Sequence, residues 1–334
     1  MKFELTREFL NELREAIDSS DKSLIIGLVG GLHSADIAEI LDDIPSDEAK
    51  VMLQFIDAEK ASDAIAELDE DDRKDILEEY TAIEIADKFI GNLESDDAAD
   101  LLQELSEEKK DAVISHIQDL EQAGDIVDLL NYEEGTAGAI MGKEYVSIDS
   151  RLSVKDAILE LRKQADEVEQ IYTIYVENEN KILLGRISLK RLLVANTNDK
   201  ISNLYSQDIH NVRVTEGQEE VVHIMRKYDL VALPVVDDLG RLMGRITIDD
   251  ALDVLSEEAE KDYQMASGLS EDIESGDSVW ASTRGRIPWL ILGLLGGIFG
   301  ARVIGIYEND LHLFPEMAFF IPLVAAMAGN VGVQ

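Results

Sequence analysis

The side chains best able to do chemistry in this sequence are its carboxylates. The chain carries 70 Asp and Glu residues against 30 Lys and Arg, a formal net charge of −40. Carboxylate oxygens are hard ligands, and a small divalent cation needs only one or two of them because it keeps several bound waters. Like charges about 4 Å apart repel by roughly 1 kcal/mol in water and about 4 kcal/mol at an effective dielectric near 20. The composition therefore favours acidic surfaces that a divalent cation draws together.

Other reactive chemistries find little support in the sequence. The chain has no Cys, which excludes disulfides, thiolate metal sites and cysteine nucleophiles. No phosphate-cradling P-loop is present, and the strong negative charge excludes nucleic acid as a natural partner. We therefore expect a protein that is not an enzyme. The histidines stand in no nucleophile or zinc spacing: His33, His116, His210, His223 and His312.

The charge is unevenly distributed along the chain. Residues 1–140 hold 39 acidic and 11 basic side chains, a net charge of −28, whereas residues 281–334 hold three of each. Within that neutral region, residues 287–306 form an apolar stretch with a single charge, long enough as a helix to span about 30 Å. Arg284 and Arg286 precede it and predict a cytoplasmic N-terminal side. A buried helix of a soluble domain is the alternative reading, and a second apolar run starts at Met317.

The first 135 residues are predicted to form only helices. Apolar residues recur at three- and four-residue spacing, as in Ile37, Ile40, Leu41 and Ile44. Short similar segments also recur about 30 residues apart, a length that suits one helical hairpin each. Such hairpins, each burying one face on its neighbour, predict a small superhelical domain. The segments contain Asp36, Asp63, Asp97 and Asp125.

Residues 143–255 are predicted to be a duplicated α/β region. Leu184-Gly185-Arg186-Ile187-Ser188 recurs as Met243-Gly244-Arg245-Ile246-Thr247, 59 residues later. Each copy is expected to contain a strand, a helix, a pair of strands and a second helix. The expected strands are 146–148, 171–176, 183–187, 212–214, 233–236 and 242–248, and the expected helices are 154–164, 189–195, 218–228 and 249–255.

This duplicated region resembles a tandem pair of CBS domains. The segments that carry the resemblance are 233–237, 240–244 and 247–250. CBS pairs often bind adenine nucleotides through a Ser/Thr-x-x-Asp pattern, which implies a nucleotide site at Tyr172, Thr247 and Asp250. The first copy has Ser188 but Arg191 where the acid belongs. A structural CBS pair without a bound nucleotide is the alternative.

The whole chain resembles the MgtE family of magnesium transporters and channels. Three segments carry the resemblance: 132–138, 247–262 and the Gly-Asn-x-Gly-x-Gln run within 322–334. The resemblance implies a multidomain protein with an all-α superhelical N-domain, an α/β tandem CBS pair, a connecting helix and α-helical transmembrane segments. The implied boundaries are 1–135 for the N-domain, 136–200 and 201–255 for the CBS domains, 256–282 for the connecting (plug) helix and linker, and 283–334 for transmembrane helices 1 and 2.

The resemblance also implies a function and a set of sites. Family members are homodimers in the inner (plasma) membrane that pass Mg²⁺ into the cytoplasm, and they close when Mg²⁺ bridges the acidic cytosolic domains and the plug helix. Mg²⁺, a second copy of the chain and the lipid bilayer are therefore the expected partners, and ATP is left open as a further ligand. Asn330 is the implied pore residue. The implied metal ligands are Asp96, Asp97, Asp100, Glu219, Asp229, Asp250, Asp253, Glu258 and Asp262.

Two questions stay open at this point. A membrane-anchored regulator that senses adenine nucleotides through the CBS pair is the alternative function, and titration with Mg²⁺ and then with ATP separates the two. The sequence stops at Gln334, before three further spans that the family has. We therefore expect this chain to be either a part of a longer transporter or a split or truncated product, and to hold the sensor and the mouth of the pore.

Overall fold

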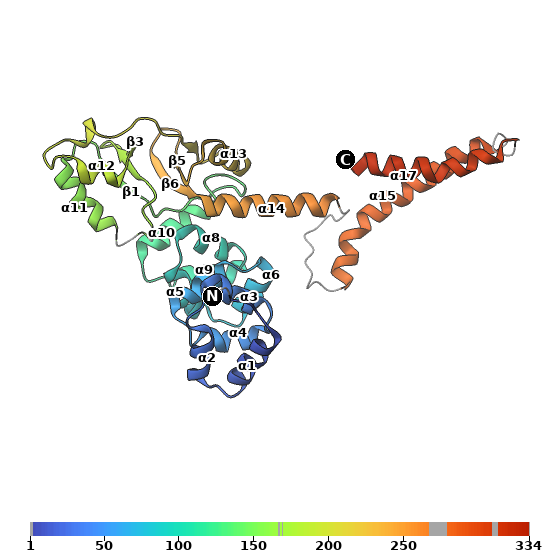
Figure 1. Cartoon of the computed structure of the whole chain (residues 1–334), viewed down its shortest axis with the longest axis horizontal. Coiled ribbons are helices and arrows are strands. Elements are labelled where there is room, and N and C mark those ends of the chain that lie inside the picture. Colours follow the sequence, from blue (N-terminus) through green and yellow to red (C-terminus); the bar gives the residue numbers. More distant parts are fainter. Residues whose placement is uncertain (1–2, 166–167, 169, 267–278, 309–312, 334) are drawn as a thin grey trace. The chain divides into compact units, whose positions relative to one another are not determined.

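The computed structural model describes residues 3–165, 168, 170–266, 279–308 and 313–333 (Figure 1). The chain divides into two compact units, Met1–Ala251 and Leu252–Gln334. The first unit contains the helical domain and both α/β copies. The second contains most of helix α14 and the helices that follow it.

The N-terminal part of the first unit consists of short helices, as the sequence predicts (Figure 1). The apolar face predicted from Ile37, Ile40, Leu41 and Ile44 is buried. The helices are α1 (Arg7–Asp18), α2 (Lys22–Val29), α3 (Ser34–Asp42), α4 (Ser46–Leu53), α5 (Ala58–Ala66), α6 (Glu70–Glu78), α7 (Ala82–Lys88), η1 (Ile90–Asn92), α8 (Ser95–Gln103), α9 (Glu107–Ile114) and α10 (Leu120–Leu129).

Neighbouring repeats of this domain pack helix against helix and are held by lysines that reach backward. Helix α3 packs on α5, α5 on α7, and α7 on α9. Lys60 Nζ donates to the carbonyls of Gly30 and Leu32, Lys88 Nζ to that of Leu53 at 2.6 Å, and Lys109 Nζ to that of Leu77 at 2.7 Å. A lysine near the C-terminal end of a helix satisfies carbonyls that the helix itself leaves unpaired. Three of the few cations of this acidic domain therefore join its repeats.

The two α/β copies have the same order of elements and the same topology. In each copy the first strand pairs in parallel with the second, and the second pairs antiparallel with the third. The first copy has β1 (Val146–Asp149), α11 (Val154–Gln164), β2 (Ile174–Glu177), β3 (Leu183–Ile187) and α12 (Leu189–Val194), followed by η2 (Ile201–Asn203); the second has β4 (Val212–Arg213), α13 (Gln218–Tyr228), β5 (Ala232–Val236), β6 (Leu242–Thr247) and α14 (Ile248–Ala266).

Each copy is completed by the segment that enters the other copy. Before β1, Gly142 exchanges two backbone hydrogen bonds with Arg245 of β6, at 2.8 and 2.9 Å. Before β4, Ser206 makes the same pair of bonds, both 2.9 Å, with Arg186 of β3. The recurring Gly-Arg pair thus marks the place where each third strand receives a segment from outside its own copy.

The glycines of this repeated motif allow the entering segment to come close. A Cβ on Gly185 would lie 2.0 Å from the carbonyl oxygen of Ser206, and one on Gly244 would lie 2.7 Å from that of Gly142. Neither gap holds a methyl group. Steric exclusion at the crossing therefore explains why glycine stands at both positions.

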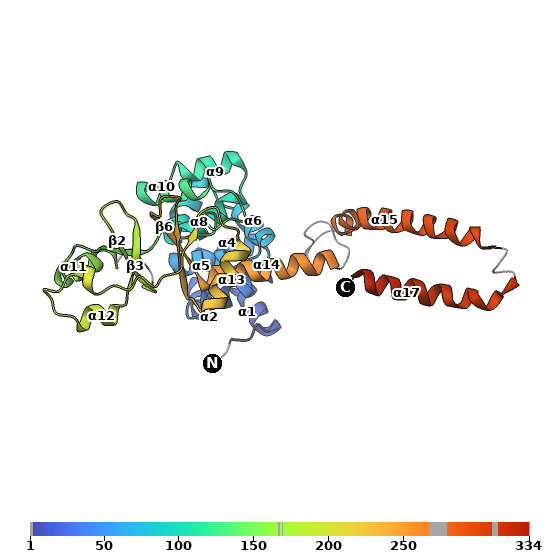
Figure 2. The ribbon, with the colours of Figure 1, turned by 90° about the horizontal axis from the view of Figure 1, so that it is seen from above.

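The segment that leaves the helical domain also follows the second copy. Ala137 N–H donates to Glu216 O at 2.7 Å, and Gly138 N–H donates to Val214 O at 2.9 Å. The helical domain therefore lies against the second copy, although the first copy follows it in sequence. Figure 2 shows α8 beside β6 on this side of the unit.

In the duplicated region, two elements differ from the sequence prediction by more than one residue at an end. The strand expected over 171–176 begins only at Ile174, because Tyr172 turns to place its ring against the guanidinium of Arg245, with 5.2 Å between the ring centroid and Cζ. The helix expected to end at Leu255 continues without a break to Ala266 as α14. No Gly or Pro interrupts residues 248–266, so nothing in the local sequence ends the helix at the copy boundary.

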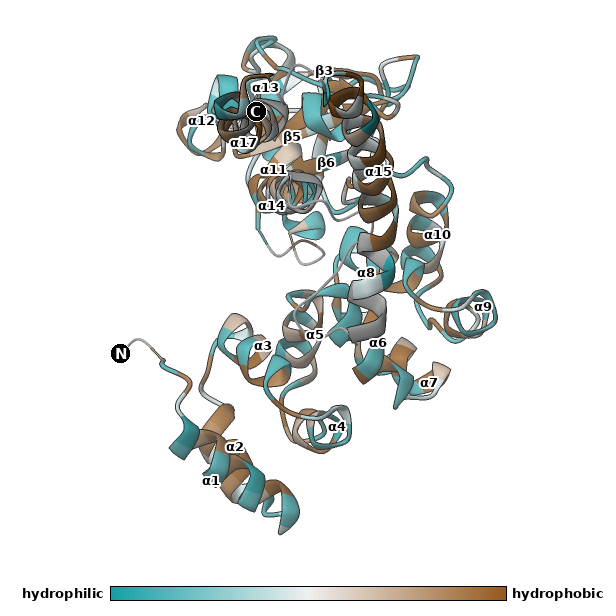
Figure 3. Ribbon diagram, turned by 90° about the vertical axis from the view of Figure 1, so that its right-hand side faces the viewer, coloured by the Kyte–Doolittle hydropathy of each residue, from teal (hydrophilic) through white to brown (hydrophobic). Residues whose placement is uncertain are grey.

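The second unit contains α15 (Val279–Ile306), η3 (Pro315–Phe319) and α17 (Phe320–Val333). Figure 3 colours most of α15 and much of α17 as hydrophobic. Among the residues that the structure describes, no single helix is both long and apolar enough to cross a membrane by itself. Leu290–Ile306 and Phe320–Gly329 are shorter apolar stretches. Among the described helices, α2 and α3 are long and apolar enough only when taken together, and they are bent by 116° at the break between them.

Candidate metal centre

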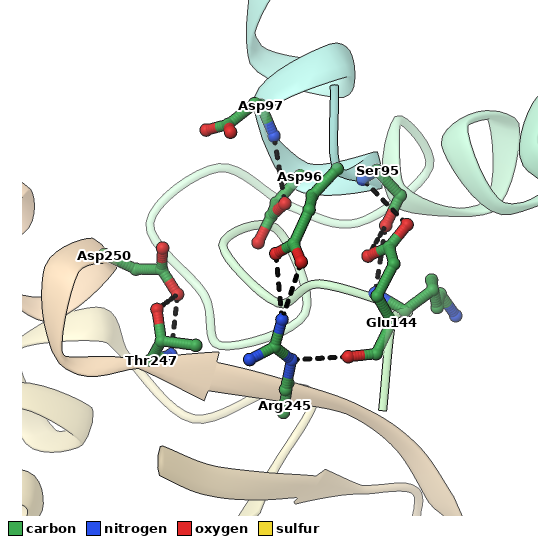
Figure 4. Close-up of polar contacts among 9 residues, drawn as sticks. Ser95, Asp96, Asp97, Glu144, Arg245, Thr247 and Asp250 are labelled. Carbon is green, nitrogen blue, oxygen red and sulfur yellow. Dashed lines mark hydrogen bonds and ion pairs between the residues drawn. The ribbon is translucent and has the colours of Figure 1, made fainter. Parts of the chain in front are cut away.

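A group of carboxylates lies where helix α8 meets the second CBS-like copy (Figure 4). Glu94, Asp96 and Glu144 each offer an oxygen, and these oxygens lie within 4.8 Å of one another. Glu94 and Asp96 stand at the start of α8, and Glu144 belongs to the segment that enters β1. Three carboxylates at this separation are suitable ligands for a hard divalent cation that keeps part of its water shell.

The start of α8 is arranged by residues from outside the helix. Ser95 is fully buried, and its N–H and hydroxyl donate to the carboxylate of Glu144 at 3.0 and 2.9 Å. The hydroxyl in turn accepts the N–H of Lys143 at 2.9 Å. Glu144 therefore caps α8 from a distant part of the chain, where a carboxylate is favoured by the helix dipole. These bonds fix Glu144 beside Asp96.

Asp96 is the most deeply buried acid of the group. Its side chain is 9% exposed, and its Oδ1 accepts the N–H of Asp97 at 3.1 Å. A Cβ on Gly142 would lie 2.8 Å from its Oδ2, so glycine at that position leaves the room that the carboxylate occupies. Asp96 thus sits against the backbone of the entering segment. Figure 4 shows its carboxylate between α8 and β6.

Asp250 extends the group from the other side. Its Oδ2 accepts the N–H of Thr247 at 2.7 Å and the hydroxyl of Thr247 at 2.8 Å. These bonds fix the carboxylate at the start of α14. Among the charged neighbours of Asp96 and of Asp97, Asp250 has the largest effect on the pKa of each. The acids of α8 and the acid of α14 therefore share one electrostatic environment.

The crowding of these acids shifts their protonation. Loss of hydration, then Asp250 and Asp97, raise the pKa of Asp96 well above its usual value. Loss of hydration, then Asp250 and Asp100, raise the pKa of Asp97 to about 7. Loss of hydration also raises the pKa of Asp250, against the two hydrogen bonds from Thr247. Ionising the group is therefore costly until a cation neutralises it.

A pH dependence of stability follows from these shifts. Without a divalent ion, we expect stability to fall as pH rises from about 5 to about 8. The folded-state pKa of Asp97 is about 7 against an ordinary value near 3.8, so the folded state binds the proton more tightly and loses that stability as pH rises through this window. Glu104, whose pKa burial raises to about 7, adds in the same direction.

Urea unfolding in chelator at several pH values measures this effect. The Asp97→Asn variant should show a shallower decline than the unsubstituted chain because it lacks one of the acids whose pKa is raised in the folded state. Stability that is constant or rises from pH 5 to 8 would contradict the electrostatic description of the centre.

The other residues singled out from the sequence lie in different places. Asp100 is one turn beyond Asp96 on α8 and acts electrostatically on Asp97. Glu219 is exposed in the first turn of α13, and Asp229 is exposed at the end of that helix with a left-handed φ of 51°. Neither belongs to the acid group at α8, which is the one cluster of this type found among the described residues.

Four of the predicted residues belong to the second unit. Asp253 and Glu258 lie on the part of α14 that this unit contains. Asp262 in α14 and Asn330 in α17 are helical in backbone, but their side chains lie outside the described part of the chain. Of the predicted nucleotide residues, Tyr172 contacts Arg245, and Thr247 binds Asp250.

The sequence reasoning missed Glu94, Glu144 and Arg245. Glu94 adjoins the predicted acids, so its position was a usable signal. Glu144 and Arg245 reach the centre only through pairings 49 and 151 residues away in sequence. No local pattern marks such a pairing.

Comparison with known proteins agrees with this architecture. The sequence model of the MgtE intracellular N domain matches residues 32–135, and that of the CBS domain matches residues 137–197 and 201–257. The chain is 30% identical over 332 residues to the magnesium transporter MgtE of Thermus thermophilus, covering 96% of this chain and 72% of that protein. The chain belongs to the MgtE family. It is also 39% identical over 214 residues to the MgtE of Enterococcus faecalis, covering 64% of this chain.

Solved MgtE structures share the fold of the first part of the chain. The soluble part of a magnesium transporter is 31% identical with a TM-score of 0.66, covering 75% of this chain and 98% of that one. The cytosolic domain of the Mg²⁺ channel MgtE in complex with ATP is 30% identical with a TM-score of 0.67, covering 73% and 99%. The chain spans about half the length of the Enterococcus faecalis and Bacillus subtilis relatives, 47% and 46%.

Proposed function

We propose that this chain is the Mg²⁺-sensing part and pore mouth of a transporter that carries Mg²⁺ across the plasma membrane into the cytoplasm. Membership of the MgtE family supports the transported ion. The observation that carries the sensing role is the group of Glu94, Asp96 and Glu144, whose oxygens lie within 4.8 Å of one another at the junction of the helical domain and the second CBS copy.

The geometry of the acid centre suits an ion-dependent junction. Its carboxylates come from the start of α8 and from the segment before β1, and Asp250 at the start of α14 adds a further negative charge nearby, so an ion bound there joins two parts of the chain and lowers their repulsion with the third. Without the ion, the like charges favour separation of these parts. An ion that binds only the joined arrangement shifts the population toward it. We infer that the joined arrangement corresponds to the closed transporter.

The second unit supplies the membrane part of the proposal. Leu290–Ile306 and Phe320–Gly329 are its apolar stretches, and Arg284 and Arg286 precede the first on the proposed cytoplasmic side. We propose that these helices belong to a multi-pass membrane domain of a homodimer, with Asn330 at the pore and residues 256–282 as the plug. Asp253, Glu258, Asp262, Glu219 and Asp229 are proposed as ligands of further ions.

Titration calorimetry of the whole chain with Mg²⁺, beside small-angle scattering, tests the proposal. We expect binding in the millimolar range or tighter, together with a smaller radius of gyration than in chelator. Absence of both heat and compaction up to ten millimolar Mg²⁺, a concentration roughly ten times that of a millimolar Kd, would refute the sensing role.

An adenine-nucleotide sensor is the second candidate function, because a relative of known structure is in complex with ATP. Thr247 and Asp250 fit a nucleotide poorly, since Asp96 and Asp97 act on the same carboxylate and repel phosphates. A cavity of about 20 Å³ between the copies is lined by Arg186, His210 and Tyr175, and the buried Tyr175 hydroxyl has no hydrogen-bond partner among the described residues. A nucleotide would require this cavity to widen.

Calorimetric titration with ATP, in the unsubstituted chain and in two variants, decides where a nucleotide binds. We expect Arg186→Gln to weaken ATP binding and Thr247→Ala to leave it within about twofold, since Arg186 lines the cavity with a cation that can bind phosphates and Thr247 does not. The reverse order would restore Thr247 and Asp250 as the nucleotide site.

A further inference from the structure

The acid centre contains a buried arginine, a cation that cannot serve as a metal ligand. Arg245, on β6, is 4% exposed. Its Nη2 donates to both carboxylate oxygens of Glu94, each at 2.9 Å, and its Nε donates to the backbone carbonyl of Glu144. Figure 4 shows the side chain of Arg245 rising from the strand toward α8.

These contacts join separate parts of the chain. Glu94 belongs to the helical domain, Glu144 to the entering segment, and Arg245 to the second CBS copy. The ring of Tyr172 covers the guanidinium, with 5.2 Å between its centroid and Cζ, so a fourth segment holds the side chain in place. A divalent ion bound to Glu94, Asp96 and Glu144 would join only two of these segments, the start of α8 and the segment before β1, so Arg245 supplies the contact to the second copy.

Burial makes the contact of Arg245 with Glu94 matter energetically. Most surface ion pairs contribute little, but removing one partner of a buried pair leaves an uncompensated charge and is strongly unfavourable. The guanidinium side chain is 5% exposed and that of Glu94 is 28% exposed. Separation of the helical domain from the second copy would therefore have to rehydrate the guanidinium or leave it without its carboxylate.

We propose that Arg245 is a tether within the acid centre: its fixed positive charge holds α8 on β6 before any Mg²⁺ binds. Its single positive charge offsets part of the repulsion among the carboxylates, and Mg²⁺ supplies the remainder. Arg245 thus sets the fraction of molecules in which α8 lies on β6 in the absence of Mg²⁺. It thereby sets how much of the change from the separated to the joined arrangement Mg²⁺ must bring about. The proposal rests on the proposed function only in taking this centre as the place where Mg²⁺ binds.

A fixed cation differs from a bound ion in one measurable respect, because chelator does not remove it. In chelator, the unsubstituted chain should contain a substantial joined population. Replacing Arg245 should lower the ratio of joined to separated molecules by about tenfold or more, the effect expected from breaking a buried pair.

The absence of cysteine from the sequence makes a distance measurement direct. Spin labels at Glu78→Cys on α6 and Glu220→Cys on α13, both exposed positions, report the separation of the helical domain from the second copy in the whole chain. Pulsed dipolar spectroscopy in chelator should give a broader and longer distance distribution for Arg245→Met than for the parent. Arg213→Met, which removes a surface pair of 3.7 Å with Asp238, is the matched control and should leave the distribution unchanged.

Two further variants separate joining from simple folding of the second copy. Glu94→Gln removes the same contact from the helical domain and should also shift the distribution in chelator, with little added effect when combined with Arg245→Met, because the two residues form one interaction. Arg245→Lys should restore joining only in part, since one ammonium cannot donate to the Glu94 carboxylate and to the Glu144 carbonyl from two separate nitrogens as the guanidinium does. Full additivity of the two substitutions would count against the tether.

Adding Mg²⁺ in the same experiment distinguishes the tether from the proposed Mg²⁺-sensing role. With ten millimolar Mg²⁺, the Arg245→Met chain should return to the parental distance. Identical distributions of the parent and Arg245→Met in chelator would overturn the tether and leave the ion site standing. A clear difference in chelator with no response of either chain to Mg²⁺ would support the tether and refute the proposed sensing role.

Discussion

The Asp96→Asn variant is expected to lose Mg²⁺ binding at the acid centre by about tenfold or more, since even outer-shell changes cost 10- to 100-fold at metal sites. Asp96 is the most buried carboxylate of the group, and its neighbours are Asp97, Glu144, Glu94 and Asp250. Asparagine keeps the shape of the side chain and removes its charge. It therefore removes both an anionic ligand and a source of repulsion.

These two consequences have opposite signs in the two conditions, which makes the variant diagnostic. In chelator, Asp96→Asn should be more stable than the parent, because one buried like charge is gone. In Mg²⁺, the parent should gain stability and the variant should gain little, because a ligand that binds the folded state stabilises it in proportion to its affinity. Thermal unfolding with and without ten millimolar Mg²⁺ measures both.

Asp47→Asn is the matched control for this experiment. Asp47 follows Ser46 at the start of α4, as Asp96 follows Ser95 at the start of α8, but its side chain is exposed. The control carries the same charge change at the same helical position. An equal loss of Mg²⁺ response in both variants would mean that the ion acts on the overall charge of the domain and not at the centre.

The Gly185→Ala variant is expected to show the largest loss of stability, about 3 kcal/mol or more. A methyl group at this position would lie 2.0 Å from the carbonyl oxygen of Ser206. The obstacle is backbone, which cannot rotate away, so either the pairing of Ser206 with Arg186 breaks or the strand moves. Loss of that pairing opens the junction between the two CBS copies.

Gly124→Ala provides the opposite expectation from the same chemical change. Gly124 lies within α10, is exposed, and has no atom within 4 Å of an added Cβ. Alanine there should stabilise the chain by about 0.5–1 kcal/mol, because glycine disfavours the helix. Urea unfolding followed by circular dichroism measures both variants. A Gly185→Ala chain as stable as its parent would show that the exchanged pairing does not form.

Much of the secondary structure could be predicted from the sequence for a local reason. The spacing of Ile37, Ile40 and Leu41 defines one helical face, and β-branched runs predicted β3 over the residues that the structure shows, 183–187. The duplication was also visible, because Gly185-Arg186 and Gly244-Arg245 recur in the same context. The predicted start of the second strand at residue 171 was wrong, because Tyr172 lies outside the strand and its ring covers Arg245, a contact that local propensity does not include.

The sequence by itself determined the acidic character of the chain, the helical and α/β parts, the two copies and the family. It did so because hydrophobic periodicity, net charge and repeated motifs are properties of neighbouring residues. Only the tertiary structure decided which carboxylates meet. The segment at Gly142 crosses to β6, and this crossing brings Glu144 and Arg245 to the start of α8. Contacts between residues 49 and 151 positions apart depend on that path of the backbone, for which no local pattern exists.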